Sequence, residues 1–195
     1  QLLDVREPLL VRLEPGVGCE ILPSDEVIRH HRVCPACGHH YRCPMDERLA
    51  LLLDEETFRE LEAELATTDL LRFKGARRYK DRLAAARKAT RADESVRVGT
   101  AEIDGRELVI GFVNADFLEG SLGCVAAERL CRLFDRAARE RLPAVVITGG
   151  GGLRAAEGVL GLSQVARLAE ARTRLAEAGV KALVDFMEAF ASSHH

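Results

Sequence analysis

The residues that could carry chemistry gather most clearly at a run of four glycines, Gly149–Gly152. The run follows the apolar segment Ala144–Thr148 and precedes Ala155–Leu175, whose pattern predicts a long amphipathic helix. Glycine lets a ligand approach the main chain closely, and the first N–H groups of a helix have no partner inside it. Such a junction offers a site for a negative oxygen, either of a phosphate or of an oxyanion that forms during a reaction.

A second glycine turn, Phe117–Cys124, contains Gly120 and Gly123 and lies between a predicted strand and a predicted helix. One junction of this kind often only eases packing, but two in succession point to a shared ligand site. Neither turn has the glycine spacing of a nucleoside-triphosphate loop or of a dinucleotide-binding loop. Residues 144–152 carry no His, Asp or Glu, and the chain has no G-x-S-x-G elbow. We therefore expect any catalysis here to use backbone N–H groups.

The elements that would position both turns form a mixed α/β pattern. Helical spacing predicts helices over residues 49–53, 56–65, 79–90 and 123–140, and alternation predicts a β-hairpin of strands 96–103 and 107–113 around Asp104-Gly105. Val180–Val184 is expected to begin a further strand. The order is therefore hairpin, glycine turn, helix, strand, glycine turn, helix, strand. This is a repeated β-β-α layout, with a turn able to bind a ligand before each of the last two helices.

Cysteine and histidine are concentrated in the first part of the chain. Cys34 and Cys37 form a C-x-x-C pair on a predicted tight turn, and Cys19 lies upstream at a spacing typical of a zinc ribbon. We predict a zinc site with these three cysteines. Candidates for the fourth ligand are His30, His31, His39, His40 and Cys43, of which we choose His40. The alternative is that the cysteines are small buried residues or free thiols. A redox pair is disfavoured because no strand leads into the motif.

The bulk composition limits the possible classes of protein. The 195 residues suffice for one full domain and a small appendage, which we place at 46–195 and 1–45. A net charge of −3 gives no general reason to expect nucleic acid or an anionic membrane. Apolar runs stay below the ~20 residues that cross a bilayer. Residues 1–6 lack the layout of a signal peptide, so we expect a cytoplasmic protein.

Four segments, taken in order, resemble one known family. They are Cys34–Arg42, Asp69–Phe73 followed by Tyr79–Leu83, Phe117–Gly123, and Gly151–Glu157. The chain resembles the carboxyltransferase β subunits of bacterial acetyl-CoA carboxylase, which combine a crotonase fold with an N-terminal zinc ribbon. The resemblance implies an α/β fold with a crotonase-like core, a β-β-α spiral, behind a small zinc-ribbon-like module.

The resemblance also implies an activity. Such subunits act on acyl-CoA or a carrier-bound acyl group, pair with an α-like carboxyltransferase subunit, and use carboxybiotin on a carrier protein. The N–H groups of Gly151 and Gly152 would stabilise the oxyanion of the thioester enolate or of the biotin ureido group. Gly120 and Gly123 would shape the other wall. Released biotin would take the α proton, and the enolate would attack CO₂.

Charged side chains near the matched segments are candidates for binding phosphate and for fixing the second glycine turn. Within the cationic run of residues 72–91 we assign Arg72, Lys80 and Arg82 to the phosphates of CoA or to an acidic carrier surface. The alternative is a solvated helix face. Nucleic-acid binding is disfavoured because two Tyr and no Trp leave little to stack on bases. Arg154 and Glu157 are expected to form a local ion pair that fixes the loop.

This chain departs from the family pattern in ways that bear on activity. The segment 16–19 retains one cysteine where two are expected, Glu119 stands where Gly is usual, and Cys124 stands where Ser is usual. A carboxylate beside an anion-binding turn is unfavourable unless it points away. The chain also ends before the family does, so we expect an exposed sheet edge that an oligomer or an α-like subunit covers. Alternative functions are a biotin-independent malonyl-thioester decarboxylase and a non-catalytic partner of an α-like subunit.

Overall fold

The computed structural model describes residues 24–41 and 43–186. The chain divides into two compact units, Gln1–Arg48 and Leu49–His195. Each unit is described by itself below. Within the described residues, none of the helices is long and apolar enough to span a bilayer.

The first unit is built around helix α1 (Ser24–Arg29) and a tight turn. The N–H of Gly38 donates to the carbonyl of Cys34 at 2.9 Å, and the N–H of Cys34 donates to the carbonyl of His39 at 2.8 Å. Gly38 has a φ of +72°, which favours glycine at this turn. Helix α2 (Met45–Leu52) begins in this unit and starts four residues earlier than the predicted helix at 49–53.

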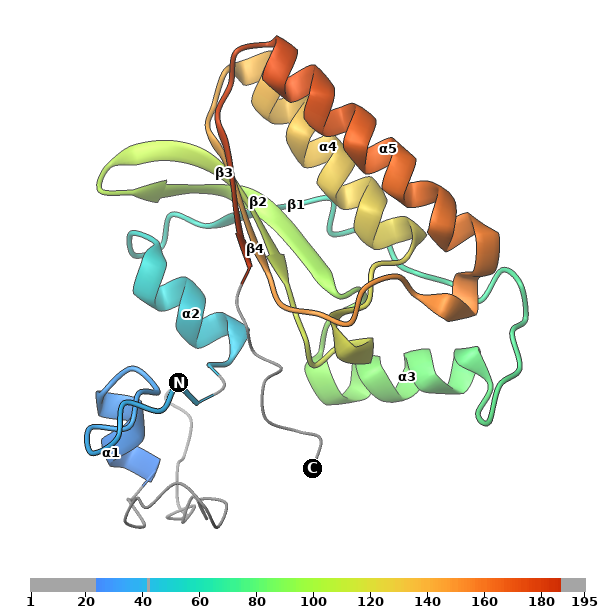
Figure 1. Ribbon diagram of the computed structural model, residues 1–195, viewed down its shortest axis with the longest axis horizontal. Coiled ribbons are helices and arrows are strands. Elements are labelled where there is room, and N and C mark those ends of the chain that lie inside the picture. Colours follow the sequence, from blue (N-terminus) through green and yellow to red (C-terminus); the bar gives the residue numbers. More distant parts are fainter. Residues whose placement is uncertain (1–23, 42, 187–195) are drawn as a thin grey trace. The chain divides into compact units, whose positions relative to one another are not determined.

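The second unit contains a five-stranded sheet with the strand order β1-β2-β3-β4-β5 (Figure 1). The strands are β1 (Arg59–Leu61), β2 (Val96–Ile103), β3 (Arg106–Val113), β4 (Ala144–Thr148) and β5 (Ala182–Phe186). The first three strands are antiparallel, whereas β3, β4 and β5 run parallel. The predicted hairpin is confirmed, because Asp104 and Gly105 both have positive φ and join β2 to β3 in register.

The helix predicted over residues 56–65 is wrong. Its central residues form β1, which pairs with β2 from Arg59 opposite Thr100 to Leu61 opposite Val98. The approach to β1 is fixed by Asp54, whose carboxylate accepts the N–H of Gly105 at 2.8 Å. Pairing with a distant strand therefore overrides the helical spacing of this acidic segment.

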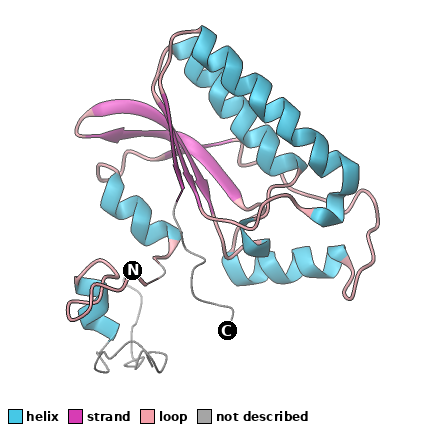
Figure 2. Cartoon of the chain, in the orientation of Figure 1, coloured by secondary structure: helices cyan, strands magenta, loops and turns pink. Residues whose placement is uncertain are grey.

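Two long helices cover one face of the sheet. Helices α4 (Cys124–Glu140) and α5 (Gly158–Glu177) lie side by side, and α4 packs on β2, β3 and β4 (Figures 1 and 2). The core between them is formed by apolar side chains of both layers, including Val96, Val98, Val109, Leu130, Leu133, Phe134, Ala171 and Leu175. Burial of this apolar area supplies the main driving force for the arrangement.

Helix α3 (Tyr79–Thr90) belongs to a second, smaller apolar cluster. Its buried residues pack with Phe117 and Ala156, one from each glycine-containing segment.

The long final helix was predicted from Ala155, but a 3₁₀ turn at Ala155–Glu157 comes first and α5 begins at Gly158. Both glycine turns therefore follow the carboxyl ends of parallel strands, where open α/β sheets bind ligands.

Candidate functional site

The two glycine turns lie directly against each other. The N–H of Leu122 donates to the carbonyl of Gly152 at 2.7 Å, and the N–H of Arg154 donates to the carbonyl of Leu122 at 2.9 Å. A third bond joins the N–H of Gly151 to the carbonyl of Glu119 at 2.7 Å. The two turns are therefore adjacent in the fold, as a shared ligand site would require, and the ligand site itself stays a prediction.

Two of the glycines are required by this close approach. A Cβ atom on Gly120 would lie 2.7 Å from the carbonyl oxygen of Gly149 and 2.8 Å from the Cα of Gly150, and Gly120 also has a φ of +66°. A Cβ atom on Gly150 would in turn overlap the carbonyl oxygen of Gly120. Only bare backbone fits between the turns at this point, so the glycines have a packing role besides any role in binding.

The N–H groups of the four predicted site glycines differ in availability. Those of Gly151 and Gly120 are bonded inside the protein, the latter to the carbonyl of Phe117 at 3.0 Å. Those of Gly152 and Gly123 have no hydrogen-bond acceptor among residues 24–41 and 43–186. The backbone of Gly152 also borders open space, because a Cβ atom there would meet nothing within 4 Å.

A buried guanidinium lies beneath the turns. Arg154, which is 4% exposed, donates from both terminal nitrogens to the carboxylate of Glu94, which is fully buried. The same guanidinium donates to the carbonyl of Ser121 at 2.6 Å and to its hydroxyl at 3.2 Å. Arg154 therefore connects the second turn, from which it projects, to the first turn and to Glu94, two residues before β2.

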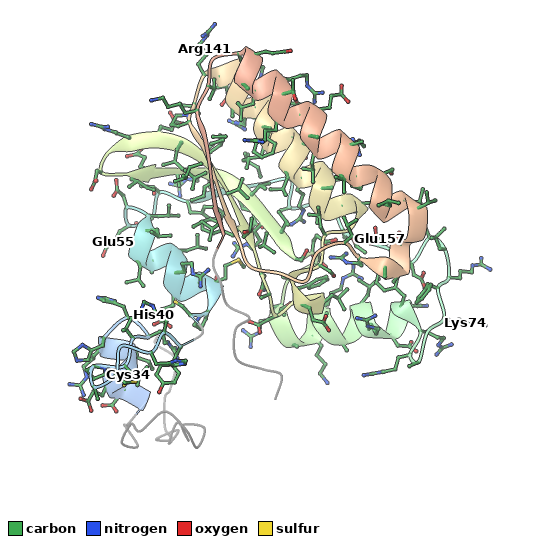
Figure 3. The ribbon with its side chains drawn as sticks, viewed as in Figure 1. Cys34, His40, Glu55, Lys74, Arg141 and Glu157 are labelled. Carbon is green, nitrogen blue, oxygen red and sulfur yellow. The ribbon has the colours of Figure 1, made fainter. Side chains whose placement is uncertain are left out.

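A second carboxylate completes the cluster. Glu157 accepts hydrogen bonds from the hydroxyl of Tyr79 at 2.7 Å, from the N–H of Cys124 at 2.6 Å and from Arg154 at 3.3 Å. Figure 3 places Glu157 at the foot of α5, and its bonds reach the first residues of α3 and α4. A negative group at the N-terminus of α4 is favourable because that helix end carries unpaired N–H donors. The predicted ion pair of Arg154 and Glu157 is confirmed.

The ionisation of the cluster follows from burial and pairing. Burial alone would raise the pKa of Glu94, but hydrogen bonding to Arg154 and its charge lower this pKa below the ordinary 4.5. Burial would lower the pKa of Arg154, and the pairing with Glu94 outweighs this and raises it. Burial raises the pKa of Tyr79, which keeps its hydroxyl protonated as a donor. Arg154 and Glu94 are therefore both charged at neutral pH.

Sequence reasoning missed Glu94, Tyr79 and Thr67 as members of this cluster. Thr67 hydrogen-bonds the carboxylate of Glu94 and is 2% exposed. No motif marks Glu94 or Thr67, because both are polar and lie outside the two glycine turns. Tyr79 opens the matched segment Tyr79–Leu83, but nothing in that segment indicates a contact with the turns. The available signal is physical: a buried guanidinium next to two turns must have acidic and hydroxyl partners from elsewhere in the chain.

The residues predicted to bind phosphates lie on the surface. Arg72 is in the loop before α3, and Lys80 and Arg82 are on that helix, all three exposed. Within the described residues, they have no ion-pair partner. Since Tyr79 at the start of α3 reaches the buried cluster, this cationic helix begins beside the glycine turns.

The predicted zinc ligands are only partly within the described residues. Cys34 is buried, whereas Cys37 and His40 are exposed, and Figure 3 labels Cys34 and His40 in the first unit. Cys19 lies outside the described residues. Among residues 24–41 and 43–186, no three His, Cys, Asp or Glu side chains gather in a way that could hold a metal ion. The zinc site therefore stays a prediction.

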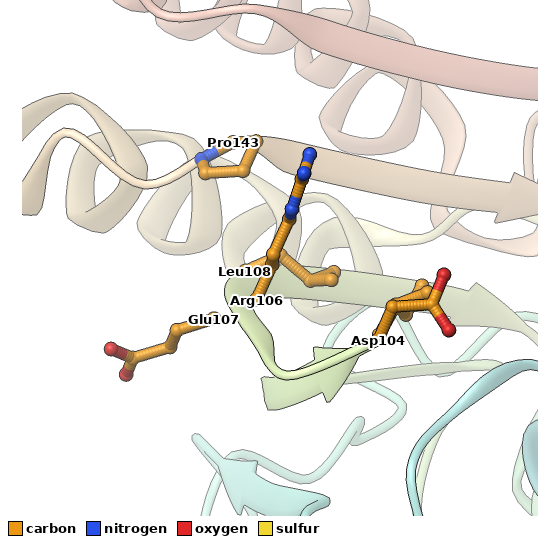
Figure 4. A pocket seen from close by; sticks show the side chains of 6 residues that line it. Asp104, Arg106, Glu107, Leu108 and Pro143 are labelled. Carbon is orange, nitrogen blue, oxygen red and sulfur yellow. The ribbon is translucent and has the colours of Figure 1, made fainter.

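A shallow cavity of about 420 Å³ lies at the far end of the sheet from these turns. It is lined by the end of β2, the hairpin turn, the start of β3 and the residue before β4, namely Ile103, Asp104, Arg106, Glu107, Leu108 and Pro143. Figure 4 shows Arg106 extending toward Pro143 while Glu107 points away. This is the amino end of the parallel strands, whereas open α/β sheets bind ligands at the carboxyl end, so we do not place the candidate site there.

Comparisons with known proteins show which family this chain resembles. Residues 44–187 match the family described as carboxyl transferase domain. The acetyl-coenzyme A carboxylase carboxyl transferase subunit beta of Synechocystis sp. is 42% identical over 139 residues, which are 71% of this chain and 43% of that protein. The chain spans about half the length of the curated relatives it matches.

Solved structures give a consistent picture. The β subunit of geranyl-CoA carboxylase from P. aeruginosa superposes with a TM-score of 0.57 at 21% identity, over 83% of this chain and 26% of that one. A Pseudomonas malonate decarboxylase hetero-tetramer in complex with malonate gives a TM-score of 0.53 at 27% identity, over 69% of this chain and 47% of that one. At 21% identity, the likeness to the geranyl-CoA carboxylase subunit concerns the fold alone.

Proposed function

This chain belongs to the carboxyl transferase domain family, and on that premise we propose that it forms part of an acyl-thioester carboxyltransferase. The crotonase-like α/β fold expected from the resemblance is confirmed by the solved structures of a transcarboxylase and two acyl-CoA carboxylases. The observation that supports the function best is the meeting of two glycine turns beyond β3 and β4, with the N–H of Gly152 lacking an acceptor among the described residues.

The proposed reaction uses backbone donors. Removal of the α proton of an acyl thioester places negative charge on the thioester oxygen, and N–H groups held in place stabilise that charge. Gly152 offers such a donor directly. Gly151 offers a second one when its bond to the carbonyl of Glu119 opens. Gly120 and Gly123 hold the opposing turn, because Cβ atoms there would overlap the second turn and the buried ion pair.

The proposal also assigns a substrate-binding role to three surface residues and requires a carrier-bound cofactor. Arg72, Lys80 and Arg82 would bind the phosphates of CoA, or the acidic face of an acyl carrier protein. Biotin on a carrier protein would supply the carboxyl group. The glycine turns suit this chemistry because an N–H donor serves a ureido oxygen as well as an enolate oxygen.

An exposed apolar surface supports a partner subunit. Leu70, Val159 and Leu162 are 74%, 73% and 61% exposed, and the loop and helix that carry them meet where Leu71 lies next to Gly158. Large contiguous apolar surface on a protein usually marks an interface. We propose that an α-like carboxyltransferase subunit, or a second copy of the chain, covers it. A well-folded monomer in sizing with light scattering, alone and with an α-like subunit, would contradict this part of the proposal.

Zinc at Cys19, Cys34, Cys37 and His40 is a separate proposal. The turn that presents Cys34 and Cys37 is held by two backbone hydrogen bonds, as suits a pair of ligands on one side of a tetrahedral ion. Metal analysis of freshly purified protein should find about one zinc per chain. A content well below that, with the chain still folded, would refute the assignment.

Decarboxylation of a malonyl thioester without biotin is the second candidate. The Pseudomonas malonate decarboxylase structure at 27% identity favours it. Loss of CO₂ from a malonyl group gives the same enolate, so the same donors would serve. The two reactions differ in their requirements: carboxyl transfer needs biotin and an acyl acceptor, whereas decarboxylation needs neither.

Both candidates can be tested in one assay. The chain, alone and with an α-like subunit, is incubated with malonyl-CoA and with malonyl carrier protein, with and without biotin, while CO₂ and the acyl product are followed. Carboxyl transfer predicts turnover only with biotin, and decarboxylation predicts it without. Absence of turnover in every combination, together with absence of CoA binding by calorimetry, would refute both.

Binding of CoA can be tested with a matched pair of variants. Arg82→Ala should weaken CoA binding about tenfold, because a charge-assisted bond to phosphate contributes roughly 1.5 kcal/mol. Arg172→Ala removes another exposed arginine, from α5, and should leave the affinity unchanged. Equal affinities of the two variants would rule out a phosphate role for Arg82.

A further inference from the structure

Glu94 occupies an unusual position for a carboxylate. It is fully buried, two residues before β2, and besides the neighbouring Ser95 it contacts two distant segments of the chain. One oxygen accepts the N–H of the neighbouring Ser95 at 2.6 Å, and the other accepts Arg154 at 3.0 Å and contacts the hydroxyl of Thr67. Burying a charge in this way is costly unless every oxygen is hydrogen-bonded, which is the case here.

The bidentate contact with Glu94 fixes the plane of the Arg154 guanidinium. A fork of two parallel bonds defines an orientation, which a single point charge cannot do. With that plane fixed, two of the remaining N–H groups of Arg154 are directed at the carbonyl and hydroxyl of Ser121, and another donates to Glu157. Ser121 lies in the middle of the first glycine turn, while Arg154 itself closes the second.

The same carboxylate also holds the segment that leads to the cationic loop. Thr67 is bonded to Glu94 through its hydroxyl and accepts Arg87 of α3 through its carbonyl at 2.5 Å. Arg72 follows five residues later. One buried carboxylate thus contacts the arginine that joins the two turns and the segment that precedes the predicted phosphate-binding residues.

We propose that Glu94 is a positioning residue that sets the relative placement of the two glycine turns by orienting Arg154. Its catalytic consequence rests on the proposed function, whereas its effect on the turns does not. A hydrogen-bonded charged cluster specifies directions that apolar packing leaves free, which suits a site whose donors must be held to within a fraction of an ångström.

The direct test is amide hydrogen exchange by NMR in the full chain. The N–H groups of Leu122, Gly151 and Arg154 form the three bonds between the turns and report on their contact. The N–H of Val109, bonded to the carbonyl of Pro143 at 3.0 Å at the other end of the sheet, reports on overall stability. In Glu94→Gln, protection of the three turn amides should fall by about tenfold or more relative to that of Val109.

Two further variants make the test specific. Glu94→Asp keeps the charge with a shorter reach and should recover part of the protection. Glu60→Gln removes a carboxylate from a partly exposed pair with Arg97 and should leave the turn amides unchanged. If Glu94→Gln does not fold, Ser121→Ala replaces it, since loss of the hydroxyl bond at 3.2 Å should loosen the same amides by about threefold.

Kinetics separate positioning from general stability. Where the wild-type chain turns over a malonyl thioester, Glu94→Gln should lower kcat by about 10²-fold with KM nearly unchanged, because misplaced donors act on the reacting oxygen and not on the phosphates. Turn amides that keep wild-type protection in folded Glu94→Gln, or in Ser121→Ala where that variant replaces it, would overturn the proposal. Absence of wild-type turnover would count against the proposed function, and the exchange result would still decide the role of Glu94.

Discussion

Gly123→Ala should damage the site severely although Gly123 has ordinary backbone angles. Its φ is −102°, so alanine meets no conformational penalty of its own. The obstacle is steric: the new Cβ would overlap a carboxylate oxygen of Glu157 and would lie 2.7 Å from Nη1 of Arg154. Real Cβ atoms essentially never approach other atoms this closely, so the carboxylate and the guanidinium must move.

The magnitude follows from what the movement breaks. Glu157 is held by the hydroxyl of Tyr79 at 2.7 Å and by the N–H of Cys124 at 2.6 Å. A shift of about an ångström would stretch both beyond hydrogen-bonding distance, and each bond to a charged group contributes roughly 1.5–3 kcal/mol. We therefore expect a loss of about 3–5 kcal/mol, the range found when a buried ion pair is broken. For a chain of this size that corresponds to a melting temperature lower by about 6–20 °C.

Gly149→Ala is the matched control, since a Cβ atom there would meet nothing within 4 Å and its φ is not positive. This change should leave stability unchanged or raise it by up to about 1 kcal/mol. Thermal melts followed by circular dichroism, with urea titrations as a second measure, compare the two variants with the wild type. Melting temperatures of Gly123→Ala and Gly149→Ala within a degree of each other would refute the steric argument.

Three further predictions concern the same cluster. Tyr79→Phe removes the hydroxyl that donates to Glu157 at 2.7 Å and should cost about 1–3 kcal/mol in urea unfolding, while an unchanged midpoint would show that water replaces the donor. The lowered pKa of Glu94 means that the unfolded chain binds more protons below pH 4.5. The contribution of Glu94 to the free energy of unfolding is therefore complete above that pH and is lost as the pH falls through its folded pKa. Between pH 6 and pH 3, the midpoint of urea unfolding should accordingly fall less steeply in Glu94→Gln than in the wild type. Burial and the bond to Glu157 raise the pKa of the Cys124 thiol to about 11, so iodoacetamide at pH 8 should modify it about 10²-fold more slowly than a peptide cysteine of pKa about 8.5.

The sequence predicts those parts of the fold whose signals are local. The Asp104-Gly105 hairpin, α3 and the segment from α4 to α5 were all expected near their observed bounds, because turn chemistry and apolar spacing act over a few residues. Strand β1 is not predicted because its conformation depends on pairing with β2, about forty residues away. Its own residues, Arg59, Glu60 and Leu61, carry no strand signal.

In the candidate site, too, the sequence predicts the residues whose signals are local and not those that only the folded chain brings together. Glycine spacing revealed the two turns, and Arg154 and Glu157 lie close enough in sequence to be paired by inspection. Glu94 is not predicted because it precedes β2 in a polar stretch typical of a linker, sixty residues from its partner Arg154. Its role becomes visible only once the chain is folded and a buried carboxylate must be accounted for.

Glu119 decides which backbone donor the proposed reaction can use. It has a φ of +61°, and its carbonyl accepts the N–H of Gly151. Its carboxylate lies beside the same glycine, since a Cβ atom on Gly151 would be 3.8 Å from Oε2. An enolate oxygen at Gly151 would therefore have to displace an existing bond and face a like charge, two costs that oppose binding there. At Gly152 the N–H has no acceptor among the described residues and a Cβ atom would meet nothing within 4 Å, so neither structural cost is evident. Within the proposed function, Gly152 is consequently the principal donor, and Gly151 serves to hold the two turns together.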